Sequence, residues 1–217
     1  MNLEKARFNM VEQQIRTWMV LEPAALAVLS AVEREKFTPI AYQSLAYADT
    51  EIPLASGQTM LPPRIDARLM HDLHLQGHES VLEVGTGSGY LAALLAHRAH
   101  HVISLEVHPE LAQTAQANLH AAGIRNAEVR VGNGASAQVA EAPFDAIVLG
   151  GSVAEVPQSL LGQLKVGGKL IAIVGDDPIM HATLFTRVAD QQWQSRVLWD
   201  TAVPTLEGFS KTSLFKF

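Results

Sequence analysis

The chain of 217 residues carries 16 Lys and Arg against 22 Asp and Glu, a formal net charge of −6; 48% of its residues are hydrophobic and 18% are charged. This composition supports a substantial folded core, excludes an intrinsically disordered chain and argues against a general nucleic-acid binder. The absence of cysteine excludes disulfides, thiolate nucleophiles and Cys-based zinc sites. We find neither a signal peptide nor the ~20 apolar residues of a membrane helix, which predicts a soluble, cytoplasmic protein without membrane contact.

The first 76 residues predict helices and one long irregular segment. Apolar residues recur every three or four positions between Phe8 and Met19, which predicts an amphipathic helix over residues 2–20. Pro23 can open a second helix that runs to about residue 32. Residues 45–63 are rich in proline, glycine and hydroxyl groups, so we interpret them as an ordered lid or substrate-binding segment. A helix over residues 64–75 follows.

Strands and helices alternate from residue 81 onward. Strands are predicted over residues 81–84, 102–105, 127–131, 145–149 and 169–174, and helices over residues 91–97, 110–122 and 157–163. Such alternation is typical of a doubly wound, mostly parallel α/β sheet. Beyond it we expect a helix over residues 179–188 and an antiparallel hairpin of two strands, 194–203 and 212–217, at the sheet edge. No linker is evident, so a single domain is predicted over residues 1–217, with N-terminal helices and a substrate loop (1–76) and a ligand-binding core (77–217).

A glycine-rich turn joins the strand at residue 81 to its helix. Gly85, Gly87 and Gly89 are spaced G-x-G-x-G, and glycine in such a turn can take positive φ and let a ligand touch the backbone. The first free N–H groups of the following helix suit a carboxylate or phosphate. The dinucleotide fingerprint is G-x-G-x-x-G, so the third glycine comes one position early, and an NAD-dependent oxidoreductase is only a distant alternative.

Glu106 ends the next predicted strand, twenty-one positions after Gly85. This is close to the ~20-residue offset at which a carboxylate meets ribose hydroxyls in nucleotide-binding βαβ units. Glycine-rich turns also follow two later strands, at residues 132–134 and 150–152. Because carboxyl ends of parallel strands share one edge of a sheet, the sequence predicts its ligand contacts along that edge.

Histidines raise the question of a metal site. His71 and His74 are three positions apart on a predicted helix, and His97, His100 and His101 lie close together in sequence. No carboxylate at a convincing spacing accompanies either group. We therefore interpret them as exposed histidines near helix ends and predict no metal.

Five stretches are similar to one known family: residues 10–16, 34–39, 46–49 with 57–59, 82–90 and 143–147. They resemble the protein-L-isoaspartate O-methyltransferases over roughly residues 10–174. The resemblance implies a seven-stranded, Rossmann-like methyltransferase sheet with N-terminal helices and an antiparallel C-terminal edge strand. It also implies S-adenosylmethionine as cofactor and, as substrate, the isoaspartyl carboxylate of damaged proteins or peptides, whose methylation starts repair. The oligomeric state stays open.

The resemblance also assigns site residues. The catalytic residues that it implies, on the substrate side, are Asp49, Gln58 and Thr59. The cofactor-binding residues it implies are Glu83, Gly85, Thr86, Gly87, Ser88, Gly89, Glu106, Val107, Gly132, Asn133 and Gly134.

Three departures from the family pattern bear on the expected site. Leu61 stands where the family has a serine, Asn133 where it usually has an aspartate near the adenine amine, and residues 150–152 (Gly-Gly-Ser) where it has Thr-Ala-Ala. Asparagine still accepts through its carbonyl oxygen, so we expect cofactor binding to survive. Leucine cannot donate a hydrogen bond; the hydroxyls that can replace the serine are those of Ser56, Thr59 and Ser152. Two alternatives therefore remain, a methyltransferase of the same build with another acceptor and a cofactor-binding protein without transferase activity.

Overall fold

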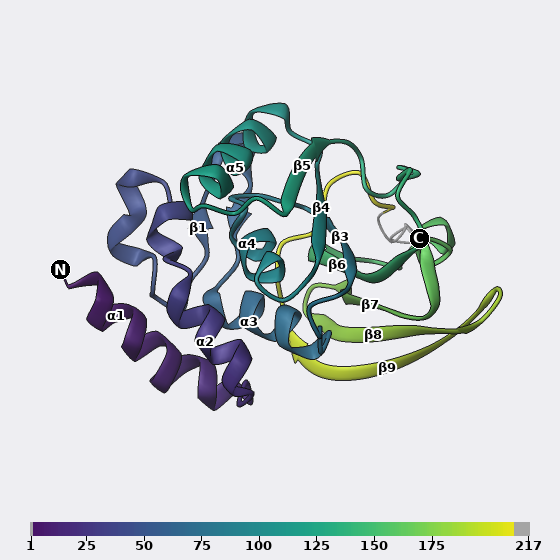
Figure 1. Ribbon diagram of the computed structural model, residues 1–217, viewed down its shortest axis with the longest axis horizontal. Coiled ribbons are helices and arrows are strands. Elements are labelled where there is room, and N and C mark those ends of the chain that lie inside the picture. The colour runs from purple at the N-terminus through teal and green to yellow at the C-terminus, as the bar shows by residue number, and fades with distance from the viewer. Residues whose placement is uncertain (1, 211–217) are drawn as a thin grey trace, which may run out of the picture.

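The computed structural model describes residues 2–210 and is built around one seven-stranded sheet (Figure 1). The strand order is β5-β4-β3-β6-β7-β8-β9. The strands are β3 (Ser80–Val84), β4 (His101–Glu106), β5 (Ala127–Val131), β6 (Phe144–Val153), β7 (Leu164–Asp176), β8 (Ile179–Ala189) and β9 (Gln192–Thr201). Strands β5 to β7 are parallel, whereas β8 and β9 are antiparallel to their neighbours. The predicted fold class, mostly parallel with antiparallel C-terminal strands, is confirmed.

Helices cover both faces of the sheet because successive strand residues point to opposite sides. Val81, Val102 and Val148 pack with α4 (Tyr90–Ala96) and with the N-terminal helices. Leu82, Ile103 and Ile147 face the other way, toward α6 (Gln158–Leu161). The N-terminal helices are α1 (Leu3–Asn9), α2 (Pro23–Ala31) and α3 (Pro63–Asp72), and α5 (Pro109–Ala121) precedes β5. No helix within residues 2–210 is long and apolar enough to cross a bilayer.

The segment over residues 45–63 is ordered and largely irregular, as predicted. It contains short 3₁₀ turns and a two-stranded antiparallel sheet of β1 (Ile52–Pro53) and β2 (Thr59–Met60). Ile52 pairs with Met60, and both side chains are buried in the main core. This anchoring fixes the position of Thr59 relative to the sheet.

The helix predicted over residues 179–188 is wrong, because this stretch forms β8. Its buried residues Met180, Ala182 and Leu184 alternate with a period of two, and Thr183 and Phe185 are residue types that favour a strand. β8 pairs with β7 on one side and with β9 on the other. The predicted hairpin partner, residues 212–217, lies outside the described residues, and the strand predicted over residues 194–203 instead pairs with β8.

The single α-helix predicted over residues 2–20 is also wrong in part. Helix α1 is followed by a π-helical turn over Met10–Ile15 and a 3₁₀ turn over Arg16–Trp18. Met19 is left-handed, with φ 62°, which ends the helical path. The wider π turn brings Met10 into the buried face together with Val11 and Ile15, while Phe8 and Met19 stay 64% and 65% exposed.

Candidate active site

The order of the strands places a switch point between β3 and β6. After β3 the chain moves outward to β4 and β5 and then returns to β6 on the other side of β3. Gly85 follows β3, and a Cβ on Gly150 of β6 would lie 2.6 Å from the Gly85 carbonyl oxygen. Only glycine permits this approach. Ligands of open α/β sheets bind outside such a point, at the carboxyl ends of the strands.

Two connected cavities open at this point. The larger, which spans about 480 Å³ including space open to solvent, is called the outer chamber; its lining includes Gln58, Gly85, Glu106, Val107, Gly132 and Leu206. The smaller encloses about 300 Å³ and is called the inner chamber; its lining includes Thr59, Leu61, Asp66, Ser88 and Tyr90. Thr59, Gly85, Gly87 and Gly150 line both.

Glu106 projects from the end of β4 at the outer chamber. It is 4% exposed, and its carboxylate accepts the backbone N–H of Gly87 at 2.8 Å and that of His108 at 3.1 Å. A carboxylate has about four acceptor positions, so others remain for a ligand. Val107 lies beside it and is 38% exposed. The structure thus places Glu106, the residue predicted to bind the ribose hydroxyls, next to the glycine turn.

Only part of the turn after β5 lines the outer chamber. Gly132 and Gly134 line it, and Gly134 packs so closely on Val84 that a Cβ would lie 2.2 Å from a Val84 methyl. The Asn133 side chain is not part of the lining. Its Oδ1 accepts the N–H of Ala135 at 3.0 Å, which stabilises the turn. The contact of Asn133 with an adenine stays a prediction.

Glu83 lies behind the glycine turn and lines neither chamber. It is fully buried in β3, where its Oε2 accepts the Ser104 hydroxyl at 2.5 Å, while its Oε1 has no partner among the described residues. The Ser104 hydroxyl also bonds that of Thr86 at 2.6 Å. Burial raises the pKa of Glu83 to about 8, the Ser104 hydrogen bond opposes this, and the charges of Asp66 and Glu106 add to it. Glu83 therefore supports the turn from inside, and its direct contact with a cofactor stays a prediction.

Thr59 is the predicted substrate-side residue that the structure places most centrally. Thr59 lines both chambers, and its hydroxyl is buried without a hydrogen-bond partner among the described residues. Gln58 lies next to it at the outer chamber, where its Nε2 donates to Glu207 at 2.7 Å. Asp49 lines neither chamber and forms an ion pair with Arg64. Its predicted role stays a prediction, without a cavity contact to support it.

The other two hydroxyls that could replace the family serine already form hydrogen bonds within the protein. Ser56 is exposed and donates to Glu110. Ser152 is buried, and its Oγ bonds the Val203 carbonyl at 3.2 Å and the Thr205 hydroxyl at 3.3 Å. Thr59 is therefore the free hydroxyl among these three candidates.

Sequence reasoning missed the segment that follows β9. It crosses back to the site, where the Leu206 N–H bonds the Ser152 carbonyl at 2.8 Å and the Leu206 side chain would be 2.5 Å from a Cβ on Gly85. Glu207 bridges Gln58 and, at 3.1 Å, His108. Nothing in the sequence of this turn signals such a role. Asp66 was also missed, although a carboxylate between the apolar residues of α3 is a detectable signal.

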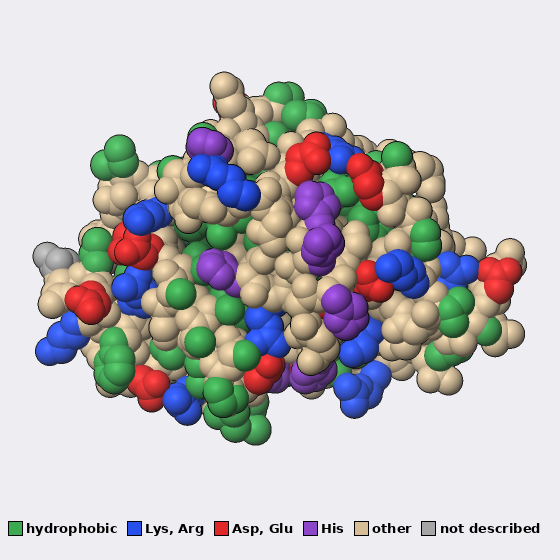
Figure 2. Space-filling view, in the orientation of Figure 1, with side chains coloured by type: hydrophobic (Ala, Val, Ile, Leu, Met, Phe, Trp, Pro, Cys, Tyr) green, Lys and Arg blue, Asp and Glu red, His purple; other side chains and the backbone are tan. Residues whose placement is uncertain are grey.

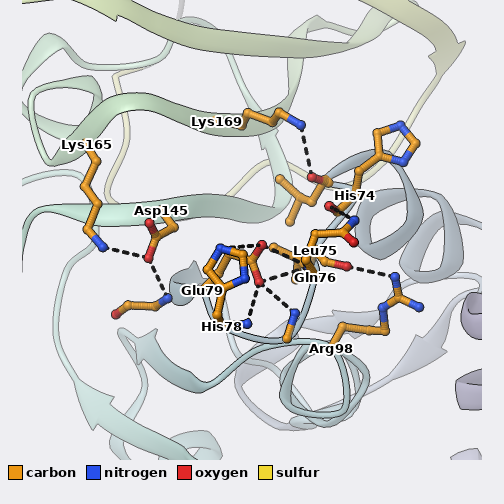
Figure 3. Close-up of polar contacts among 12 residues, drawn as sticks. His74, Leu75, Gln76, His78, Glu79, Arg98, Asp145, Lys165 and Lys169 are labelled. Carbon is orange, nitrogen blue, oxygen red and sulfur yellow. Dashed lines mark hydrogen bonds and ion pairs between the residues drawn. The ribbon is translucent and has the colours of Figure 1, made fainter.

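The opposite edge of the sheet has a cavity of about 760 Å³, but its polar groups bond one another (Figure 3). Lys165 pairs with Asp145 at 2.8 Å, and the Glu79 carboxylate accepts the backbone N–H groups of Gln76, Gly77 and His78. At the carboxyl edge, by contrast, the hydroxyl of Thr59 is buried without a partner from residues 2–210. Unpaired buried donors are costly and point to a ligand at the carboxyl edge.

The histidines do not gather around a common point. His71 and His74 contact each other edge-to-face with ring centroids 5.4 Å apart, and His71 bonds Asp72 at 2.9 Å. Within the described part of the chain, no three His, Asp or Glu side chains are placed to hold a metal ion.

A glycine turn and a strand-end carboxylate at the switch point of a mostly parallel sheet define an α/β protein with a nucleoside-cofactor site. A sequence model of the family described as protein-L-isoaspartate(D-aspartate) O-methyltransferase matches residues 5–206. The chain belongs to this family.

Individual relatives agree with the family match. A protein-L-isoaspartate O-methyltransferase of Rhodopseudomonas palustris is 40% identical over 200 residues, 92% of each chain. One of Methanoculleus marisnigri is 43% identical over 171 residues, 79% of this chain and 78% of the relative. A Plasmodium falciparum protein of this type, solved in complex with S-adenosyl-L-homocysteine, superposes with a TM-score of 0.78 at 23% identity, over 95% of this chain and 99% of that one. This last likeness shows the shared fold.

Proposed function

We propose that this protein is an S-adenosylmethionine-dependent O-methyltransferase that methylates the isoaspartyl carboxylate of damaged proteins. Family membership and relatives of about 40% identity with that name support it. The observation that carries the proposal is the unpartnered Thr59 hydroxyl at the boundary of the two chambers, with Glu106 in the outer one. This arrangement holds a nucleoside on one side and offers a hydrogen-bond donor where the chambers meet.

The residues of the outer chamber fit the nucleoside part of such a cofactor. Glu106 can accept from two ribose hydroxyls, and Val107 offers an apolar contact for adenine. The backbone at Gly85 and Gly132 can approach the ligand because no side chain intervenes. When bound, the cofactor supplies an activated methyl group on a sulfonium.

Methylation of a carboxylate requires little acid–base catalysis by the protein. The acceptor is already ionised at neutral pH, so no general base is needed. Thr59 can orient the acceptor oxygen, and the buried side chains of Met60 and Leu61 keep water out of the inner chamber. Because opposite charges on the reactants disappear in the transfer, a dry site favours reaction. Positioning can supply most of the rate, since held reactants reach effective molarities of roughly 10⁵–10⁸ M.

The two parts of the proposed single domain contribute different residues to the site. Residues 1–76 provide Gln58 and Thr59 at the acceptor side, and residues 77–217 provide the cofactor-binding turns. Gln58 and Glu207 line the outer chamber and hydrogen-bond each other at 2.7 Å.

The surface and charge favour a protein substrate over a nucleic acid. On the face seen in Figure 2, acidic and basic side chains are interspersed and form no continuous basic surface. The net charge of −6 works in the same direction. We place the activity in the cytoplasm, because the proposed cofactor is an intracellular metabolite.

The test is transfer of a labelled methyl group from S-adenosylmethionine to an isoaspartyl peptide, with the aspartyl peptide of the same sequence as control. Labelling of the isoaspartyl peptide alone is the expected result. Cofactor binding by calorimetry without labelling of either peptide would reject the proposed acceptor.

One observation favours a methyl acceptor other than the isoaspartyl carboxylate. Leu61 presents a buried apolar side chain to the inner chamber where the family has a serine. If the isoaspartyl peptide is not methylated, this pocket selects a less polar acceptor, or the protein binds the cofactor without transfer. The single variant Leu61→Ser separates these cases, because gain of isoaspartyl labelling would show that the leucine excludes that substrate.

A further inference from the structure

The turn after β5 contains the dipeptide Asn133–Gly134. The chain has five asparagines, and Asn133 alone is followed by glycine; the other four precede leucine, methionine or alanine. Asparagine is a thermolabile residue, because the nitrogen of the next peptide bond can attack its side-chain amide carbon. A glycine at the next position has no side chain to hinder this attack. Asn133 is therefore the asparagine of this chain that is most susceptible to the reaction.

The packing of the turn requires a glycine at position 134. Gly134 is buried against Val84, and a Cβ on it would lie 2.2 Å from a Val84 methyl carbon. A larger residue would have to displace Val84 at the end of β3. The susceptible dipeptide is thus a consequence of how closely the turn approaches β3.

The hydrogen bonds of the turn favour the attack. Asn133 Oδ1 accepts the Ala135 N–H at 3.0 Å, and this donor can stabilise the negative charge that the oxygen gains when the amide carbon is attacked. The attacking group, the Gly134 N–H, has no hydrogen bond to another residue of the range 2–210. The Asn133 Nδ2, which leaves as ammonia, is likewise not bonded by any described residue. The nucleophile and the leaving group are therefore free, while the attacked carbonyl is polarised.

We propose that Asn133–Gly134 is a site of spontaneous deamidation and that its isoaspartyl product disables the outer chamber. The Gly134 nitrogen bonds to the Asn133 side-chain carbon, its proton leaves with the amide as ammonia, and a cyclic succinimide forms. Water then opens the ring at either carbonyl. Breaking the new bond gives an aspartyl residue, and breaking the original peptide bond gives an isoaspartyl residue. The net change is gain of water and loss of ammonia, so no other reactant is needed.

The isoaspartyl linkage does not fit the packed turn. It routes the main chain through the Cβ of residue 133 and so lengthens it by one carbon. Gly134 is packed on Val84, and the Asn133 side chain lies against Gly208, where a Cβ would be 2.6 Å from Oδ1. The turn begins at Gly132, which lines the outer chamber and donates its N–H to the last carbonyl of β4 at 2.8 Å. Displacement of the turn therefore moves part of the chamber lining.

The test follows the full-length protein while it ages at neutral pH and physiological temperature. Peptide mapping measures conversion at residue 133, and endoproteinase Asp-N separates the two products, because it cleaves before aspartyl but not before isoaspartyl residues. Asn118 and Asn126 are internal controls. We expect residue 133 to convert before either control and no more slowly than in a synthetic peptide of residues 128–139, with the isoaspartyl form among the products.

Binding measures the effect on the chamber, which rests on the proposed function. Calorimetry gives the fraction of aged protein that binds S-adenosylhomocysteine, and this fraction should fall as the isoaspartyl content rises. Asn133→Ser is the matched control, because a serine hydroxyl can still accept the Ala135 N–H but cannot form a succinimide. Its binding fraction should stay constant during ageing. If Asn133→Ser does not fold, Asn133→Thr, which keeps the hydroxyl, replaces it.

Three results would overturn the inference. They are conversion at residue 133 that is slower than in the peptide or no faster than at Asn126, isoaspartyl content that rises without loss of binding, and an equal loss of binding in Asn133→Ser. Fresh wild-type protein that does not bind S-adenosylhomocysteine would overturn the proposed function and with it the effect on the chamber. The peptide map alone then still decides whether Asn133 is a deamidation site.

Discussion

The buried carboxyl of Glu83 should make the stability of this protein fall as pH rises. Its pKa is raised by burial from 4.5 to about 8. Between these two values the unfolded chain releases this proton while the folded chain keeps it. The native state then binds more protons than the unfolded state, so the free energy of unfolding decreases with increasing pH. Glu83→Gln removes the ionisable group and keeps the shape.

The magnitude follows from linkage. A single group of this kind contributes a slope of about 1.4 kcal/mol per pH unit inside the window. From pH 5 to pH 7 wild type should therefore lose roughly 3 kcal/mol relative to Glu83→Gln. The amide oxygen of the variant can still accept the Ser104 hydroxyl, but the amide nitrogen takes the place of the unpartnered Oε1 and has no partner either. Glu83→Gln should therefore be no more stable than wild type near pH 5.

Urea unfolding at pH 5, 6, 7 and 8 measures this difference directly. We expect the midpoint of Glu83→Gln to rise relative to wild type at each step. Glu155→Gln, at an exposed position, is the control and should track wild type. A gap between Glu83→Gln and wild type that stays constant from pH 5 to pH 8 would refute the reasoning.

Three further variants test the site. Gly87 has φ 54° and would bring a Cβ within 3.4 Å of Leu54, so Gly87→Val should abolish S-adenosylhomocysteine binding in calorimetry; undiminished binding would remove the turn from the site. Glu106→Ala should raise the dissociation constant roughly 10- to 100-fold, since hydrogen bonds to a charged acceptor are lost, and an unchanged constant would contradict the ribose assignment. Thr59→Val should lower turnover roughly tenfold or more while cofactor affinity stays the same. Equal losses of affinity and turnover would instead assign Thr59 to the cofactor.

Much of the core could be predicted because its signals are local. The alternation of short apolar runs and helical stretches, together with the turn at Gly85–Gly89, gives the parallel strands and the edge at which they end. Glu106 lies at the outer chamber because strand ends in a parallel sheet necessarily meet there. The local sequence pattern wrongly predicted a helix over residues 179–188, because pairing with two neighbouring strands decides the structure there.

The remaining parts of the site depend on contacts between distant residues. Arg34 and Asp66 are 32 positions apart, and neither side chain reveals its partner in the sequence. Gly150 and Gly151, noted first as a departure from the family, have a structural reason: side chains there would clash with Gly85 and with Leu206. Such reasons arise only when the packed arrangement is known.

The outer chamber takes one wall from distant parts of the chain, because Gln58 lines it together with Leu206 and Glu207 and hydrogen-bonds Glu207. Synthesis delivers the N-terminal part first, so strands β3 to β6 can pair on the ribosome while this wall is still missing. A nascent chain can therefore pair strands β3 to β6 before its ligand pocket is complete. Affinity for the cofactor would then appear late, and the ligand would stabilise the finished protein without guiding the early steps of its folding.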